Sequence, residues 1–348
     1  MANALAGRRL ARLLDHLPLR EPTAAAAAGA AAESDSASAA APGKSSATNK
    51  PFVDREHFDE HGFVIVRDML TEQDLAKVEA DYDVLVNQRA QQWLEAGHLE
   101  TTHGDLPFDR RLAAIAHDLP STIQESELKP FLHSMDTMSA RCKGTFDFFF
   151  SEGLLAAVEQ IVGPEITLNP IQHIRPYIPH RYGGGYGSTT WHQDQAVTQE
   201  EADGYDILTC WIPFTKTTTA NGALRILKNV AKRQDLVIGH HEDEDIAELW
   251  PGGEPVDCLV GRGDAVFISA YTPHRGTLNS SDTVRWSMDL RFQRTGTPTG
   301  RPAHPAFVLQ SREDPSSVDD SFDEWCRRWV EGIENVRSGR FPHGHRQG

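Results

Sequence analysis

The hydrophobic pattern of this chain predicts a β-rich body that lies between two amphipathic helices. Apolar residues recur at helical spacing after Thr71, where Asp74 completes a capping-box pattern, and again over 321–337. Between the helices the clearest strand signal is 284–292, in which apolar and polar residues alternate strictly. Short apolar runs bounded by Gly, Pro and Asn predict further strands at 63–66, 165–178, 207–214, 222–227, 256–260 and 264–270.

Many short strands separated by turn residues are typical of a sandwich or a barrel. No alternation of strands with helices appears, which disfavours a parallel nucleotide-binding sheet. The glycine-rich run 183–187 contains no lysine and is not a phosphate-binding loop. We therefore predict a mainly β fold with flanking α-helices over 51–348, closed by the helix at 321–337.

The first fifty residues have a different composition from the rest. They are rich in alanine, and no Leu, Ile, Val or Phe occurs between Arg20 and Pro51. Such a segment cannot bury enough apolar surface to offset the entropy of ordering it, so we predict that 1–50 is disordered. Residues 1–20 combine leucines with arginines, which leaves an organelle-targeting peptide open beside the expected cytoplasmic location.

The charge balance excludes several classes of partner. The chain has 34 Lys and Arg against 50 Asp and Glu, a formal net charge of −16, which argues against nucleic acid or an anionic membrane surface. No apolar run is long enough for a membrane span. The four cysteines form no Cys-x-x-Cys pair, which argues against a zinc ribbon. We expect a small-molecule substrate, and the sequence leaves the oligomeric state open.

A possible metal site follows from the placement of histidines. A His and an Asp two residues apart on a strand point to the same side, and with a second His they can form the 2-His-1-carboxylate triad of non-haem iron oxygenases. Four His-x-Asp pairs occur, so the pair alone is weak evidence. We favour His192 and Asp194, because only this pair has a suitable third ligand downstream, His274, which ends an apolar strand. The three competing pairs lie in polar or acidic stretches: His57/Asp59, His103/Asp105 and His241/Asp243. The acidic run 240–245 that carries the last pair is predicted to be a solvated insertion.

Arg285 follows His274 by eleven residues, on the alternating strand. A guanidinium can bind a carboxylate with two parallel hydrogen bonds, which suits the far end of 2-oxoglutarate when its other end chelates iron. Alternation alone favours a solvent-facing strand residue at Arg285, whereas its place after His192, Asp194 and His274 favours the cosubstrate role. Arg291 has the same parity on the strand and is the alternative anchor.

Together these segments resemble the phytanoyl-CoA dioxygenase family of Fe(II)/2-oxoglutarate oxygenases. The similarity covers roughly 52–295. The matching segments are GFVIVRDMLTEQDL at 62–75, WHQDQA at 191–196, LTCWIPF at 208–214, NGALRIL at 221–227 and GDAVFISAYTPHRGTLNSSDTVRWSMDLRF at 263–292.

The resemblance implies a double-stranded β-helix, the core of jelly rolls and cupins. It implies Fe(II) on His192, Asp194 and His274, and 2-oxoglutarate on Arg285 with O₂ as the second cosubstrate. It also implies that Trp211 borders the cosubstrate pocket and that Gln172 lies near iron.

The resulting prediction is an Fe(II)/2-oxoglutarate-dependent dioxygenase that oxidises, most simply hydroxylates, a small organic molecule and releases succinate and CO₂. Two alternatives remain on the same scaffold. One is a metal-dependent hydrolase or isomerase that does not use 2-oxoglutarate, and Arg285 argues against it. The other is a non-catalytic binding protein, and the intact triad argues against that.

The segment 171–191 bears on the substrate. It holds no acidic residue, but it contains Arg175 and Arg181 among tyrosines and leads directly into His192. A basic segment beside an iron site predicts a substrate with a carboxylate or another compact anion, bound by Arg181 or Arg175. The competing interpretation is a structural loop whose arginines pair with the many carboxylates of the body.

Overall fold

The computed structural model describes residues 51–183 and 189–338, so the predicted disordered segment 1–50 lies outside the described residues. The α-helices are α2 Arg55–His61, α3 Glu72–Glu95, α4 Phe108–Asp118, α5 Ser121–Ile123, α6 Lys129–Ser134, α7 Thr137–Ala140, α8 Lys143–Phe148, α9 Glu152–Val162, α10 Ile246–Leu249 and α11 Phe322–Arg337, and a π-helix, η1, spans Gln124–Leu128. No helix in the described ranges is both long enough and apolar enough to cross a membrane.

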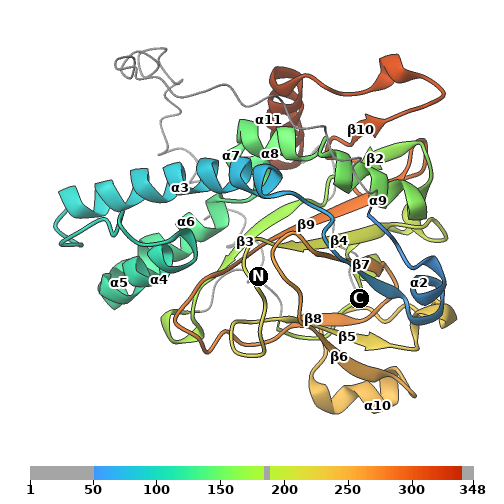
Figure 1. Cartoon of the computed structure of the whole chain (residues 1–348), viewed down its shortest axis with the longest axis horizontal. Helices are drawn as coiled ribbons and strands as arrows, with labels where there is room; N and C mark the ends of the chain where they lie inside the picture. Colours follow the sequence, from blue (N-terminus) through green and yellow to red (C-terminus); the bar gives the residue numbers. More distant parts are fainter. Residues whose placement is uncertain (1–50, 184–188, 339–348) are drawn as a thin grey trace, which may run out of the picture. The chain divides into compact units, whose positions relative to one another are not determined.

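The strands form two antiparallel sheets (Figure 1). Their bounds are β1 Phe63–Val66, β2 Ile166–Leu168, β3 His173–Tyr177, β4 Leu208–Pro213, β5 Leu224–Lys228, β6 Glu254–Cys258, β7 Ala265–Ser269, β8 His274–Gly276, β9 Arg285–Arg294 and β10 Phe307–Gln310. The large sheet has the order β1-β7-β4-β9-β2-β10, with β3 also paired to β9, and the small sheet has the order β6-β5-β8. The central strand of the large sheet is therefore β9, which pairs with β2, β3 and β4.

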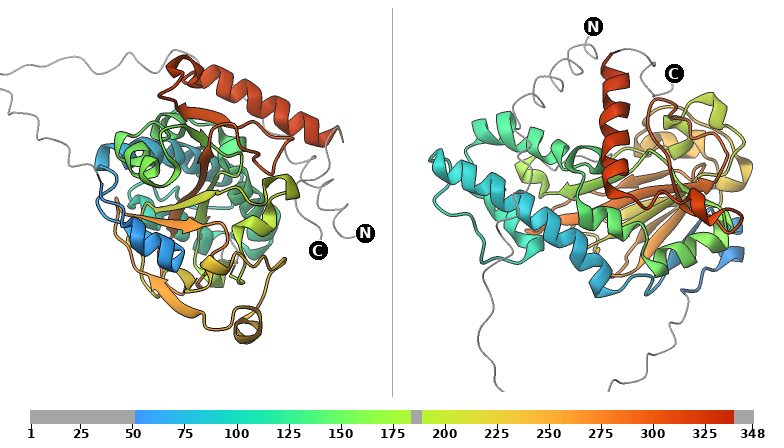
Figure 2. Two further views of the ribbon diagram at one scale, coloured as in Figure 1. Left: turned by 90° about the vertical axis from the view of Figure 1, so that its right-hand side faces the viewer. Right: turned by 90° about the horizontal axis from the view of Figure 1, so that it is seen from above.

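The helices α3, α4, α8 and α11 lie on the face of the large sheet that is opposite the small sheet, whereas α10 lies beside the small sheet (Figure 1). Trp286 on β9 shows how they pack: its ring lies 5.9 Å from Tyr82 of α3 and stacks on Phe108 of α4 at 4.5 Å. In the right-hand view of Figure 2, α3, α8 and α11 lie over the strands of this sheet. Because the helices cover one face, the other face of β9 is turned toward the small sheet.

The predicted elements agree with the structure in kind. The helix after Thr71 begins with the expected capping box, in which the Thr71 hydroxyl accepts from the Asp74 amide and the Asp74 carboxylate accepts from the Thr71 amide. The helix α11 starts one residue after the predicted 321. An antiparallel sheet core with flanking helices is the observed architecture, as expected at that level.

Three details differ from the prediction. The expected strand 165–178 is split into β2 and β3, since Pro170 has no amide hydrogen for the sheet ladder. The short strands β8 and β10 were not predicted. The region 108–162 is largely helical although no helix was predicted there, so helices contribute more of the chain than the strand-rich pattern implied.

Candidate metal and cosubstrate site

The structure brings His192, Asp194 and His274 together. Their ligand atoms all lie within 4.8 Å of one another, and no second group of three such residues occurs in the described part of the chain. Two backbone hydrogen bonds of 3.1 and 3.0 Å join His192 to His274 across an antiparallel bridge, which places the two side chains directly opposite each other. Asp194 begins a 3₁₀ turn rather than continuing a strand, so its orientation comes from that turn and not from the predicted strand spacing.

Backbone carbonyls fix the tautomer of both imidazoles. The Nδ1 of His192 lies 3.1 Å from the Thr190 carbonyl oxygen, and the Nδ1 of His274 lies 3.0 Å from that of Thr272. A carbonyl can only accept a hydrogen bond, so each Nδ1 carries the proton and each Nε2 keeps a free lone pair. The Nε2 of His274 points toward the carboxylate of Asp194, 3.9 Å from Oδ1.

The protonation states suit a divalent cation. Burial and the neighbouring His274 lower the pKa of His192 to about 3, so this imidazole is neutral near pH 7. Burial opposes ionisation of Asp194, but the neighbouring Arg291, His274 and His192 together outweigh it and lower the pKa of that carboxyl well below its ordinary value. Two imidazoles and one carboxylate in these states are a donor set that fits non-haem Fe(II).

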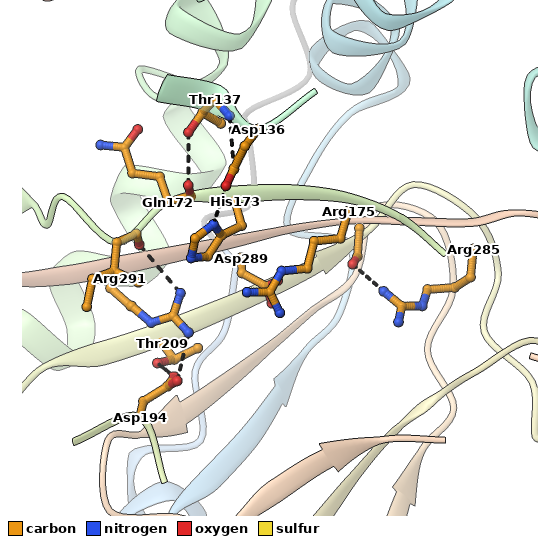
Figure 3. A network of polar contacts seen from close by, with 12 residues as sticks. Asp136, Thr137, Gln172, His173, Arg175, Asp194, Thr209, Arg285, Asp289 and Arg291 are labelled. Carbon is orange, nitrogen blue, oxygen red and sulfur yellow. Dashed lines mark hydrogen bonds and ion pairs between the residues drawn. The ribbon is translucent and has the colours of Figure 1, made fainter. Parts of the chain in front are cut away.

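Two residues of the large sheet hold the carboxylate of Asp194. Arg291 donates to Oδ1 at 2.7 Å, and the hydroxyl of Thr209 donates to Oδ2 in a short hydrogen bond (Figure 3). Arg291 and Thr209 are register partners on β9 and β4, and both are buried. Sequence reasoning considered Arg291 only as an alternative cosubstrate anchor, because its pairing with a residue 97 positions away leaves no local signal.

A buried tryptophan anchors the segment that carries these ligands. Trp191 is fully buried, packs against Leu227 and Trp250, and donates from Nε1 to Asp243 at 2.7 Å. It also forms an antiparallel bridge with His241. The acidic run that contains His241 and Asp243 was predicted to be a solvated insertion. Asp243 is indeed exposed, but it also accepts the hydrogen bond that holds Trp191, the residue before His192.

The other two His-x-Asp pairs do not assemble a similar group. His103 lies 2.7 Å from Asp118, and His57 packs against the ring of Phe63.

Arg285 is buried at the start of β9. Its Nε donates to the Gly222 carbonyl oxygen at 3.1 Å, and its guanidinium carbon lies 5.1 Å from the Tyr177 ring and 5.4 Å from the Trp211 ring. A second, short hydrogen bond runs from Nη1 to the Ser287 hydroxyl. No carboxylate of the described residues lies within ion-pair distance of this guanidinium. Burial lowers its pKa to about 10, so it is still cationic at neutral pH.

Gly222 makes this arrangement possible. It has a φ of +87°, and an added Cβ would lie 2.7 Å from the Tyr177 ring. A larger residue at this position would therefore push the tyrosine away from the guanidinium.

The remaining predicted residues occupy different positions. Trp211 is on β4, and its ring lies beside the guanidinium of Arg285. Gln172 is fully buried before β3. Its Nε2 donates to the Asn169 carbonyl at 3.3 Å, and its Oε1 has no hydrogen-bond partner among the described residues. No hydrogen bond joins Gln172 to the three clustered residues in the described ranges.

The two arginines predicted for substrate differ in exposure. Arg175 is on β3, and its Nε lies 3.5 Å from Asp289 Oδ2 (Figure 3). Arg181 is exposed, donates to the Ser281 carbonyl at 2.9 Å and forms a short ion pair with Asp282. Both arginines therefore contact carboxylates of the body, as the structural interpretation of the segment expected.

Comparison with known proteins places the site in a family. The sequence model of phytanoyl-CoA dioxygenase (PhyH) matches residues 58–287, which include His192, Asp194, His274 and Arg285. The chain belongs to the phytanoyl-CoA dioxygenase family. It is therefore a member of a dioxygenase family.

One curated relative of this family member is the 2-aminoethylphosphonate dioxygenase of uncultured bacterium HF130_AEPn_1, 24% identical over 155 residues. The match covers 44% of this chain and 55% of the relative, so the chain spans about half the length of the curated relative it matches.

Two solved structures are similar to this PhyH-family chain. One is the apo form of the non-heme monooxygenase ThoJ, with 19% identity over 82% of this chain and 99% of that chain and a TM-score of 0.49. The other is EctD from S. alaskensis with 2-oxoglutarate and 5-hydroxyectoine, with 14% identity over 73% and 80% of the two chains and a TM-score of 0.46.

Proposed function

We propose that this chain is an Fe(II)/2-oxoglutarate-dependent dioxygenase that oxidises, most simply hydroxylates, a small organic molecule on a double-stranded β-helix core. The proposal rests on two features that occur together. The first is the group of His192, Asp194 and His274, and the second is Arg285, a buried cation with no carboxylate partner among the described residues. Family membership supports the same reading.

The residues have separate roles in this proposal. His192, Asp194 and His274 would hold Fe(II), and Arg285 would bind the far carboxylate of 2-oxoglutarate through its fork of donors. When bound, iron and 2-oxoglutarate supply the oxidant that is formed from O₂, with succinate and CO₂ as the other products. Trp211 and Tyr177 flank Arg285 and exclude water from it, which strengthens its interaction with a carboxylate.

We further propose that Arg175 or Arg181 binds an anionic group of the substrate. The segment 171–191 is basic and leads into His192, which favours a substrate with a compact anion over a large CoA thioester. The name of the curated relative, a dioxygenase of a small phosphonate, supports the same substrate class. Arg175 is the stronger candidate, because it lies on β3 next to β9 whereas Arg181 is exposed.

The test is turnover of 2-oxoglutarate in variants of the metal group. We expect His192→Ala and His274→Ala to fold but to lose Fe(II) binding, measured by anaerobic calorimetry, and succinate release. His57→Ala is the matched control, since His57 belongs to a competing His-x-Asp pair, and it should behave like wild type. Full succinate release in either cluster variant would refute the assignment. Tight metal binding without any binding of 2-oxoglutarate would favour the hydrolase or isomerase, and absence of metal binding in wild type would favour the non-catalytic binding protein.

A further inference from the structure

One buried carboxylate, Asp289, has no role in the site described above. It lies on β9, four residues after Arg285 and two before Arg291, and is 8% exposed. Its neighbours Met288 and Leu290 belong to the core under the helices, on the opposite face of the strand. Asp289 therefore faces the interior between the sheets, and Figure 3 shows its side chain between those of the two arginines.

Asp289 accepts no hydrogen bond from any described residue. Its single ion pair within the described ranges is the 3.5 Å contact with Nε of Arg175, which is longer than an ordinary hydrogen bond. Buried carboxylates are normally satisfied by donors, because a buried charge without them is unfavourable. The carboxylate of Asp289 is therefore able to accept hydrogen bonds from a bound molecule.

The surroundings of Asp289 favour a cation. Its register partner on β4 is Trp211 and its register partner on β3 is His173. The indole of Trp211 already has the guanidinium of Arg285 near its ring, at 5.4 Å. An aromatic ring next to a carboxylate is an environment in which proteins bind ammonium groups.

The charges on this interior face lead to the same conclusion. In the proposed function, 2-oxoglutarate neutralises Arg285, and Arg291 is paired with Asp194. Of the described residues of β9 and β3, the charged pair that remains at the centre of the face is Arg175 with Asp289, a cation and an anion. A substrate that matches both would itself carry an anion and a cation.

We propose that Asp289 is a substrate-binding residue that accepts hydrogen bonds from a nitrogen cation, so that the substrate is a small dipolar molecule with an ammonium group as well as an anion. This inference rests on the proposed function, because it concerns the substrate of the same site.

The experiment uses the full-length protein loaded anaerobically with Fe(II) and 2-oxoglutarate, and calorimetric titration with matched pairs of probes. The pairs are 2-aminoethylphosphonate with ethylphosphonate, and β-alanine with propionate; each pair differs only in the ammonium group. We expect at least one ammonium-bearing probe to bind wild type more tightly than its partner. In Asp289→Asn this advantage should fall by roughly thirtyfold or more, the usual effect of removing one member of a buried hydrogen-bonded charge pair. Glu254→Gln, on the exposed edge strand β6, is the control and should retain the advantage.

The results separate the two claims. If wild type with Fe(II) fails to bind 2-oxoglutarate, the proposed function fails and this inference fails with it. If 2-oxoglutarate binds but no ammonium probe exceeds its partner in wild type, the inference alone is wrong, and this comparison does not depend on the folding of any variant. An advantage that persists in Asp289→Asn, with a melting temperature near that of wild type, would also overturn it.

Discussion

Replacing Arg285 with lysine tests the cosubstrate anchor without removing its charge. The guanidinium is held by Gly222 and Ser287 and lies against two aromatic rings, so its donors are already oriented before a ligand arrives. A lysine ammonium is a point charge without the planar fork, and it cannot reproduce this arrangement. The loss of one charge-assisted hydrogen bond costs about 1.5–3 kcal/mol, which is roughly a ten- to hundredfold loss of affinity.

The assay is calorimetric titration of the metal-loaded protein with 2-oxoglutarate, supported by the KM from succinate release. We expect Arg285→Lys to raise both the dissociation constant and the KM by about that factor, and Arg285→Gln to raise them further. Arg225→Lys is a suitable control, because Arg225 pairs with Asp257 at the small sheet and should leave both constants unchanged. Unchanged values in Arg285→Lys and Arg285→Gln would refute the reasoning and direct attention to Arg291.

Three further predictions follow from the same structure. Arg291→Gln should weaken Fe(II) binding about ten- to a hundredfold in a competition assay, since Arg291 orients Asp194, while Arg291→Lys should restore part of the affinity. The pKa of His192 is lower in the folded chain than its ordinary value of 6.5, so the metal-free protein should lose stability as the pH falls from about 6.5 toward 3. In His192→Gln, the free energy of unfolding measured with urea should fall less steeply over this pH range. The difference in slope from wild type should be up to about 1.4 kcal/mol per pH unit. A chain without residues 1–50 should keep the melting temperature and succinate release of the full chain, and a marked fall in either would show that the segment contributes to the body.

The alternation over 284–292 shows what sequence reasoning could reach. It predicted the strand β9 and placed Arg285 and Arg291 on one face, and both residues are found on that face. It could not decide whether the polar face meets solvent, because the small sheet that covers it comes from distant segments of the chain. In the structure both faces are buried, so the polar residues of β9 line the interior between the sheets.

The different roles of Arg285 and Arg291 could be assigned only from the fold. Arg291 reaches Asp194 because β9 and β4 pair in a register that places it opposite Thr209, and such a register has no signature in the local sequence. By contrast, the helix α4 could have been predicted from the spacing of its apolar residues. Leu112, Ile115, Ala116 and Leu119 follow the spacing of an amphipathic helix, and all four are buried.

The measurement that tests the central claim most directly is a crystal structure of the protein grown without oxygen in the presence of Fe(II) and 2-oxoglutarate, with anomalous diffraction data at the iron edge. The account predicts a single anomalous peak in this chain, bound by Nε2 of His192, Nε2 of His274 and the carboxylate of Asp194. It also predicts 2-oxoglutarate between that peak and the guanidinium of Arg285. An iron peak at other residues, or 2-oxoglutarate bound away from Arg285, would contradict it.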